Sequence, residues 1–331
     1  MTLPRIAIIG TGGTISSIAT DPFDYVDYPE TGRKLSVSEV IDQIPRLATI
    51  ADLVPVPFRE VGSSAIGPAD WLRLVATIRA TAQDDGIAGF VILHGTATLE
   101  ETAWFLNLTL DIAQPVVLVG AQRPLNTVGS DAAANAIAAL RVAADPQARD
   151  RGVLVVLNDE IHAAREVAKG STYRLHAFHS GAFGPLGVVD PDRVVFTRRP
   201  ERPHTAATPF RVDKATALPR VDILYAMAGA DETLARAAIA AGARGIVSAG
   251  FAPGMTAPTE RAVLVEAAAR GVVIVQASRV GSGRVSRRQW LRQQGWIGAD
   301  DLSPHKARIL LMLALMHSND PDWIQTCFET Y

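Results

Sequence analysis

The chain alternates short apolar runs with alanine-rich segments over most of its length, and this alternation restricts the possible fold more than any other feature. Apolar runs without an alternating polar residue are typical of strands that are covered on both faces of a parallel sheet. We predict strands at 6–9, 90–93, 116–119, 153–157, 223–225, 245–248 and 272–275. Helices are predicted at 71–82, 100–112, 132–144, 232–241 and 260–269. The pattern therefore predicts an α/β fold with a doubly wound, mostly parallel sheet.

The alternation stops between Arg198 and Arg220, where prolines and charged residues accumulate. A chain of 331 residues is long enough for two domains, at about 150 residues per domain. We therefore predict a larger N-terminal α/β domain at 1–197, a linker at 198–220, and a smaller C-terminal parallel-sheet domain at 221–331.

Composition excludes several classes of function. Lysine and arginine number 32 against 34 acidic residues, which gives a net charge of −2 and no basic field to hold a nucleic acid. The single cysteine, Cys327, excludes an intramolecular disulfide framework and a cysteine-only zinc site. No uninterrupted apolar stretch reaches the ~18 residues of a membrane span. The short apolar run at 6–9 does not resemble a signal peptide, so we expect a cytoplasmic protein, although an earlier removal of a leader stays open.

Polar residues follow several predicted strands, and ligands of parallel α/β sheets bind beyond the carboxyl ends of the strands. Thr14 follows the first strand after two glycines, Thr96 follows the next, and Lys169 lies beyond a later one. Thr98 and Glu101 have the spacing of a helix capping box. A threonine hydroxyl is inert without a neighbouring base, which a lysine supplies if the fold brings it within reach. Taken alone, each threonine is better explained by a turn or a helix cap, and the lysine is much better explained by a surface charge.

Other motifs fail. The glycine-rich turn at 10–16 lacks the dinucleotide spacing and a Walker lysine, so a nucleotide site rests on that turn alone. His176 and His179 lack a third ligand at a useful spacing. Ser303 and Lys306 match a catalytic S-x-x-K by letter, but Ser303 followed by Pro304 is better explained as the start of a helix. We therefore predict no cofactor and no metal.

Taken together, these segments resemble the bacterial-type L-asparaginase and glutaminase family over nearly the whole chain. Two stretches carry most of the resemblance: IGTGGTI at 9–15 and HGTATLEETA at 94–103. Similar stretches continue at 115–124, 151–159, 165–169, 184–187, 245–250 and 303–315. The resemblance implies a cofactor-free amidohydrolase, usually a homotetramer in which pairs of subunits complete each other's sites.

The resemblance also implies roles for individual residues. Thr14 matches the threonine that attacks the side-chain amide carbon, and Thr96 and Lys169 match two members of a polar trio that supports proton transfer. The family places a tyrosine on a flexible lid after the first strand. Tyr28 fits this position better because Gly32 and a predicted helix follow it, and Tyr25 remains the alternative.

For the substrate, Ser63 matches the serine that holds the substrate carboxylate, and the backbone carbonyl of Ala121 would face the leaving amide. Ala97 departs from the family motif His-Gly-Thr-Asp-Thr, whose aspartate binds the α-ammonium group and pairs with the lysine matched by Lys169. Ser64 stands where the family commonly has a glutamine. An asparagine-rich turn of the family is also replaced, by Pro253 and Met255.

Two interpretations of these departures remain open. One is an asparaginase disabled by an introduced substitution at Ala97. The other is a natural relative whose substrate is an amide, lactam or imide without an α-amino group. A homologue that binds a ligand without catalysis is a further alternative.

Overall fold

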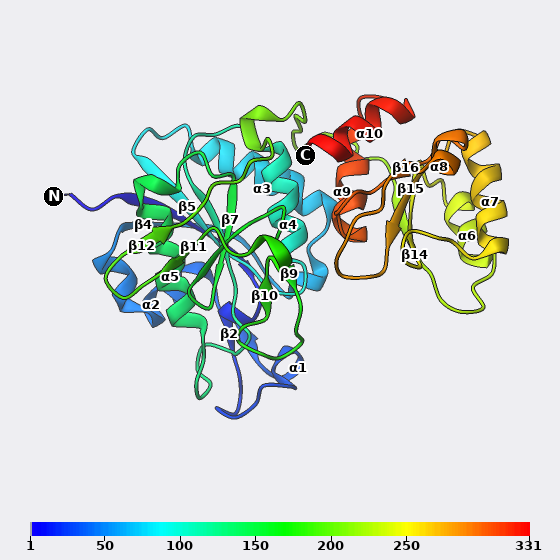
Figure 1. Ribbon diagram of the computed structural model, residues 1–331. Helices are drawn as coiled ribbons and strands as arrows, with labels where there is room; N and C mark the ends of the chain where they lie inside the picture. The colour runs from blue at the N-terminus through cyan, green and yellow to red at the C-terminus, as the bar shows by residue number, and fades with distance from the viewer. Residues whose placement is uncertain (1) are drawn as a thin grey trace. The chain divides into compact units, whose positions relative to one another are not determined.

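The computed structural model describes residues 2–331, and the chain divides into two compact units. One unit ends at Ala215 and the other comprises Thr216–Tyr331. Both units are α/β, as the alternating pattern predicts, and Figure 1 shows their sheets separately.

The larger unit is built on an eight-stranded sheet with the order β12-β11-β8-β7-β6-β5-β1-β4. Five neighbouring strands are parallel: β4 (Asp52–Val61), β1 (Arg5–Gly12), β5 (Ile87–Leu93), β6 (Val116–Val119) and β7 (Val153–Leu157). The remaining strands extend the sheet in antiparallel fashion: β8 (Glu160–Ala163), β11 (Gly187–Val189) and β12 (Val194–Phe196). The predicted doubly wound, mostly parallel sheet is therefore confirmed.

Helices cover both faces of this sheet (Figure 1). On one face, α2 (Val37–Gln43) and α5 (Ala132–Ala144) bury alanine and branched side chains against alternate residues of the strands. On the other, α3 (Pro68–Thr81) and α4 (Leu99–Thr109) pack through Trp71 and Phe105, whose rings stack 5.2 Å apart. Successive strand side chains point to opposite faces, so both faces of a buried strand must be apolar. This explains the continuous apolar runs in the sequence.

The strand β4 is absent from the sequence prediction because Pro55 and Pro57 lie inside it. Proline has no N–H to donate, so it is tolerated only where a strand lacks a neighbour on one side. β4 is such an edge strand, paired with β1 alone.

The smaller unit contains four parallel strands in sequential order: β13 (Val221–Tyr225), β14 (Gly245–Gly250), β15 (Val273–Ser278) and β16 (Ile297–Gly298). Its helices are α6 (Thr233–Ala240), α7 (Pro258–Ala269), α8 (Gln289–Gln293), α9 (Pro304–Ala314) and α10 (Pro321–Thr330). Ser303 takes the N-cap position of α9 and Pro304 begins that helix, as the sequence predicts. The all-parallel sheet of the predicted C-terminal domain is thus present.

Several short elements lie in the connections of the larger unit: α1 (Tyr28–Thr31), β2 (Ser17–Ile18), β3 (Arg33–Lys34), β9 (Ala168–Lys169) and β10 (Phe178–His179). Short 3₁₀ helices occupy Thr14–Ser16, Pro45–Thr49, Ser63–Ala65, Pro146–Ala148, Gly181–Phe183 and Thr205–Ala207. Throughout residues 2–331, no helix has both the length and the apolar character needed to cross a membrane.

Candidate active site

Three adjacent parallel strands end at one edge of the large sheet, and each end carries a hydroxyl side chain. β4 leads to Ser63, β1 to Thr14 and β5 to Thr96. Because β1 lies between β4 and β5 and runs parallel to both, the loops that follow these strands leave the sheet side by side. Strand order, rather than sequence spacing, therefore gathers these three residues.

Two glycines let the loops approach one another. Gly13 has a φ of 85°, and a Cβ atom at this position would lie 2.2 Å from the Cα of Gly95. A Cβ atom on Gly95 would lie 2.7 Å from the Oγ of Ser63. No side chain fits at these distances, so the close approach of the loops requires glycine at both positions.

Thr14 pairs with a tyrosine from the segment that follows it. The Oγ1 of Thr14 lies 2.6 Å from the hydroxyl of Tyr28, the first residue of α1. Burial raises the pKa of Tyr28, and the hydrogen bond with Thr14 offsets this only in part. Tyr25, the sequence alternative, instead donates to the carbonyl of Val128 and stacks under the guanidinium of Arg123. The structure therefore brings Tyr28, and not Tyr25, to Thr14.

Thr96 pairs with a lysine that lies 73 residues further along the chain. The Nζ of Lys169, on β9, donates to the Oγ1 of Thr96 at 2.7 Å. The backbone N–H of Lys169 donates to Glu100 at 3.0 Å, which holds the strand against the start of α4. Burial lowers the pKa of Lys169, while the charge of Glu100 raises it by a smaller amount. The result is a half-buried amine directly behind a buried threonine hydroxyl.

Ser63 is held by the loop after β5. Its Oγ accepts the backbone N–H of Ala97 at 3.1 Å, and its carbonyl accepts the hydroxyl of Thr98 at 2.8 Å. The predicted capping box of Thr98 and Glu101 is therefore wrong: Thr98 takes the N-cap position of α4 but makes no side-chain cap hydrogen bond. Its hydroxyl instead connects the loop after β5 to the loop after β4, a long-range contact that local spacing does not reveal.

These residues border one open cavity of about 250 Å³. Its lining includes the side chains Thr14, Tyr28, Lys34, Ser63, Ser64, Thr96, Ala97 and Lys169. Ala97 and Ser64 are exposed at this cavity. Ala121, the remaining residue expected at the site, lies buried just beyond β6 and is not part of the lining.

Lys34 is the charged residue in this lining that the sequence did not single out. It lies on β3 and donates from Nζ to the Oγ of Ser17 at 3.0 Å. Ser17 in turn donates to the carbonyl of Gly13, the residue before Thr14. Burial lowers the pKa of Lys34, with a smaller opposing effect from the charge of Glu30. A single lysine after a turn has no distinguishing signal in the sequence. Lys34 is identified only because the folded chain places β3 beside the loops that carry Thr14 and Ser63.

The buried ring of His94 supports the loop that carries Thr96. Its ring contacts the carbonyl of Gly95 through Nδ1 at 2.8 Å and the hydroxyl of Thr102 through Nε2 at 2.9 Å. Trp71 donates to the same hydroxyl. Burial lowers the pKa of His94 to about 4, so the imidazole is neutral at physiological pH. Its role is to fix the loop, because it is fully buried and the cavity lining does not include it.

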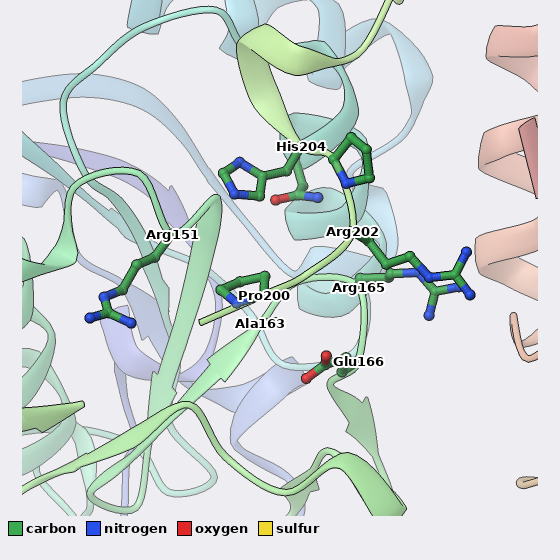
Figure 2. A pocket seen from close by; sticks show the side chains of 9 residues that line it. Arg151, Ala163, Arg165, Glu166, Pro200, Arg202 and His204 are labelled. Atoms are coloured by element: carbon green, nitrogen blue, oxygen red, sulfur yellow. The ribbon is translucent and has the colours of Figure 1, made fainter. Parts of the chain in front are cut away.

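A second hollow lies elsewhere in the larger unit, near His204 and Glu166 (Figure 2). Its volume of about 20 Å³ is close to that of one water molecule. Figure 2 shows Arg151 on one side and Arg165 and Arg202 on the other, with the guanidinium of Arg151 pointing away from the other two. This hollow is therefore not a second site for an organic ligand.

Among residues 2–331, no group of three or more histidine, cysteine, aspartate or glutamate side chains is placed to hold a metal ion.

Comparisons with known proteins agree with this arrangement. The N-terminal asparaginase domain matches residues 5–202, and the glutaminase/asparaginase C-terminal domain matches residues 220–328. A probable periplasmic L-asparaginase of Haemophilus influenzae is 39% identical, over 99% of this chain and 93% of its own. L-asparaginase 2 of Escherichia coli is 38% identical, over 100% and 94% of the two chains. The glutaminase-asparaginase of Pseudomonas fluorescens is 33% identical, over 99% of this chain and 91% of its own.

A solved structure shows the same fold. The crystal structure of a probable cytoplasmic L-asparaginase from Campylobacter jejuni superposes with a TM-score of 0.95, at 39% identity and 99% coverage of both chains. Both domain matches and all of these relatives point to one family. The chain belongs to the asparaginase family and is an asparaginase-like amidohydrolase.

Proposed function

We propose that this protein hydrolyses the side-chain amide of L-asparagine or of a related amide to the acid and ammonia, with Thr14 as the nucleophile. One observation carries the proposal. The pair Thr14–Tyr28 and the pair Thr96–Lys169 border the same cavity, each with a short hydrogen bond of 2.6 Å or 2.7 Å. Covalent amide hydrolysis needs a hydroxyl nucleophile with a base near it, and this cavity is lined by two hydroxyl groups and a lysine.

In the proposed reaction, the Oγ1 of Thr14 forms a bond with the amide carbon and loses its proton. The carbon–nitrogen bond then breaks, and ammonia leaves after the nitrogen has gained a proton. Water attacks the resulting ester, which releases the carboxylate and restores the Thr14 hydroxyl. The Thr96 hydroxyl and backbone N–H groups near the start of α4 would stabilise the oxyanion, because the N-terminus of a helix favours negative charge.

The two candidate proton acceptors differ in their pKa directions. Burial raises the pKa of Tyr28, so its phenolate form is scarce at neutral pH. Burial lowers the pKa of Lys169, so its neutral amine form is more abundant than that of an exposed lysine. A base works best when its pKa lies near the operating pH. We therefore assign the final proton acceptor to Lys169 through Thr96, while Tyr28 orients Thr14.

Recognition of the substrate involves Ser63 and Ser64, which line the cavity; Ala121 does not line it, so its carbonyl is not assigned to the leaving amide. The hydroxyl of Ser63 still has its own proton to donate, since its contact with Ala97 uses it as an acceptor. Ala97 offers no side-chain charge to an ammonium group. Losing one charged contact of this kind costs about 2–5 kcal/mol of binding, so L-asparagine should bind weakly to this chain.

The nucleophile is tested with Thr14→Ala. We expect ammonia release from the best amide substrate to fall by at least about 1000-fold, because the bond-forming atom is removed. Thr77→Ala is the matched control, since the Thr77 hydroxyl contacts only the carbonyl of Arg73 in its own helix. Thermal unfolding should be similar in both variants. Retained turnover in Thr14→Ala would refute the mechanism.

The same assay separates catalysis from mere binding. A non-catalytic homologue would show thermal stabilisation by amides without ammonia release from any of them. Assays with asparagine, glutamine, succinamate and maleamate cover the substrates considered.

We also propose a homotetrameric assembly, by analogy with the family, which light scattering at several concentrations would test. The cytoplasmic location expected from the sequence stays a prediction, because the names of similar proteins include both a periplasmic and a cytoplasmic L-asparaginase.

A further inference from the structure

The cavity beside Thr14 is lined by two lysines and, among the described residues, by no acidic side chain. Lys34 comes from β3 and Lys169 from β9, so the two ammonium groups reach the cavity from separate segments. The other polar lining side chains are hydroxyl groups, which are neutral at physiological pH. The fixed charge of the lining is therefore positive.

Nearby carboxylates do not cancel this charge within the cavity. Glu30 faces solvent, where water and salt screen its effect on Lys34. Glu100 accepts the backbone N–H of Lys169, while the Nζ atom points to Thr96. Burial lowers the pKa of both lysines by more than the charge of Glu30 or Glu100 raises it, so neither carboxylate fully offsets the burial of its lysine. A bound anion would supply the missing compensation.

Lys34 is also fixed in place. Its contact with Ser17, and the contact of Ser17 with the carbonyl of Gly13, connect its ammonium group to the loop of the proposed nucleophile. An ammonium group has three donors, and this contact uses one of them. Its remaining donors are available to a ligand in the cavity that it lines.

We propose that this site takes monoamides of dicarboxylic acids, which carry a carboxylate and no ammonium group, and that Lys34 is a substrate-binding residue for that carboxylate. The inference rests on the proposed amidohydrolase function and assigns it a substrate class. Hydrolysis of such a compound converts a monoanionic amide and water into a dicarboxylate dianion and an ammonium ion. An amide with an ammonium group would instead meet two like charges.

Four amides of similar size test the charge preference: succinamate, neutral succinamide, zwitterionic L-asparagine and cationic β-alaninamide. Calorimetric titration of full-length Thr14→Ala measures binding without turnover. We expect succinamate to bind at least about 100-fold more tightly than β-alaninamide and more tightly than L-asparagine. Equal or tighter binding of L-asparagine or β-alaninamide, or no binding of succinamate at tens of millimolar, would overturn the proposal.

The role of Lys34 is tested in the same background with Lys34→Met, Lys34→Arg and Lys214→Met. Lys34→Met should weaken succinamate binding about tenfold or more and leave β-alaninamide unchanged or improved. Lys34→Arg keeps the charge and should retain most of the affinity. The exposed Lys214 lies outside the cavity, so Lys214→Met should change nothing. Equal weakening of all four ligands by Lys34→Met would indicate a structural role and refute the assignment.

The design separates this inference from the proposed mechanism. If Thr14→Ala still releases ammonia, the nucleophile assignment fails. The order of the four amides, then measured as kcat/KM, still decides the charge preference.

Discussion

The Nζ of Lys169 donates to the Oγ1 of Thr96 at 2.7 Å, although Thr96 follows β5 of the large sheet and Lys169 lies on β9 of a separate two-stranded sheet. On the other side of the cavity, Thr14 makes a similar contact with Tyr28. Burial favours the neutral form of both partners, which raises the pKa of the tyrosine and lowers that of the lysine. The site therefore holds a lysine that gives up its proton more readily than an exposed lysine, together with a phenol that keeps its own.

This difference predicts a pH dependence that belongs to Lys169. Its amine fraction grows as the pH rises toward its lowered pKa, so kcat should increase with pH above neutrality. Glu100→Gln removes the charge that raises this pKa and preserves an oxygen acceptor for the backbone N–H of Lys169. The rising limb should therefore move to lower pH, which a kcat–pH profile measures.

Lys169→Met is the companion variant. It should lower kcat by about 100-fold or more, because general base catalysis contributes about 10²–10⁴. Lys214→Met controls for the loss of a lysine. If the rising limb of the kcat–pH profile does not move in Glu100→Gln, the titrating group is not Lys169.

Ala97→Asp should change the substrate preference. The new carboxylate would stand at the exposed edge of a cavity that already contains Lys169, where it can pair with an ammonium group. We expect the ratio of kcat/KM for L-asparagine to that for succinamate to rise about 30-fold or more, which corresponds to about 2 kcal/mol. Ala65→Asp places the same charge on a neighbouring exposed position outside the lining and serves as the control.

The result also separates the two interpretations of Ala97. A gain of several orders of magnitude in asparagine turnover would identify a disabled asparaginase. An unchanged ratio would leave a different substrate as the explanation.

Asp24→Ala should loosen the segment that carries Tyr28. The Asp24 carboxylate accepts the backbone N–H groups of Val26 and Asp27 at 2.9 Å and 2.7 Å, directly before α1. We expect kcat/KM to fall about tenfold because Tyr28 is less well placed at Thr14. Asp27→Ala removes a carboxylate from the same loop that makes no side-chain cap contact, so it is the control. Equal activities of the two variants would exclude this role for Asp24.

Gly13→Ala should damage the fold as well as the site. The positive φ and the approach to Gly95 together should cost roughly 3 kcal/mol or more, through backbone strain and overpacking. Gly67→Ala is the control, because a Cβ atom there meets no heavy atom within 4 Å. Its unfolding free energy should change by less than about 1 kcal/mol. Urea unfolding of both variants makes the comparison, and a similar change in both would contradict the packing argument.

Much of the fold follows from local sequence. The buried strands β5, β6 and β7 are apolar on both faces, so their composition alone predicts a parallel sheet. The edge strand β4 escapes the prediction because two prolines interrupt its pattern, and only its position beside β1 makes them acceptable.

The predicted site divides in the same way. Thr14 and Thr96 follow predicted strands and Lys169 lies beyond a later one, so the rule that ligands bind beyond the carboxyl ends of parallel strands drew attention to these three residues. Tyr28 and Ser63 entered through the family resemblance, because Tyr28 has no local signal that distinguishes it from a surface residue and the strand before Ser63 was not predicted. Lys34 was not foreseen by either route.

The sequence alone determined the buried parallel strands and the helices between them, since backbone propensity and apolar periodicity are local properties. It also placed small and hydroxyl residues after the strands. The tertiary structure decided which of these residues meet. Strand order brings Ser63, Thr14 and Thr96 to one edge of the sheet, and the return of β3 and β9 adds Lys34 and Lys169. The positive charge of the cavity comes from lysines on segments that are distant in sequence, so it arises only when folding brings those segments together.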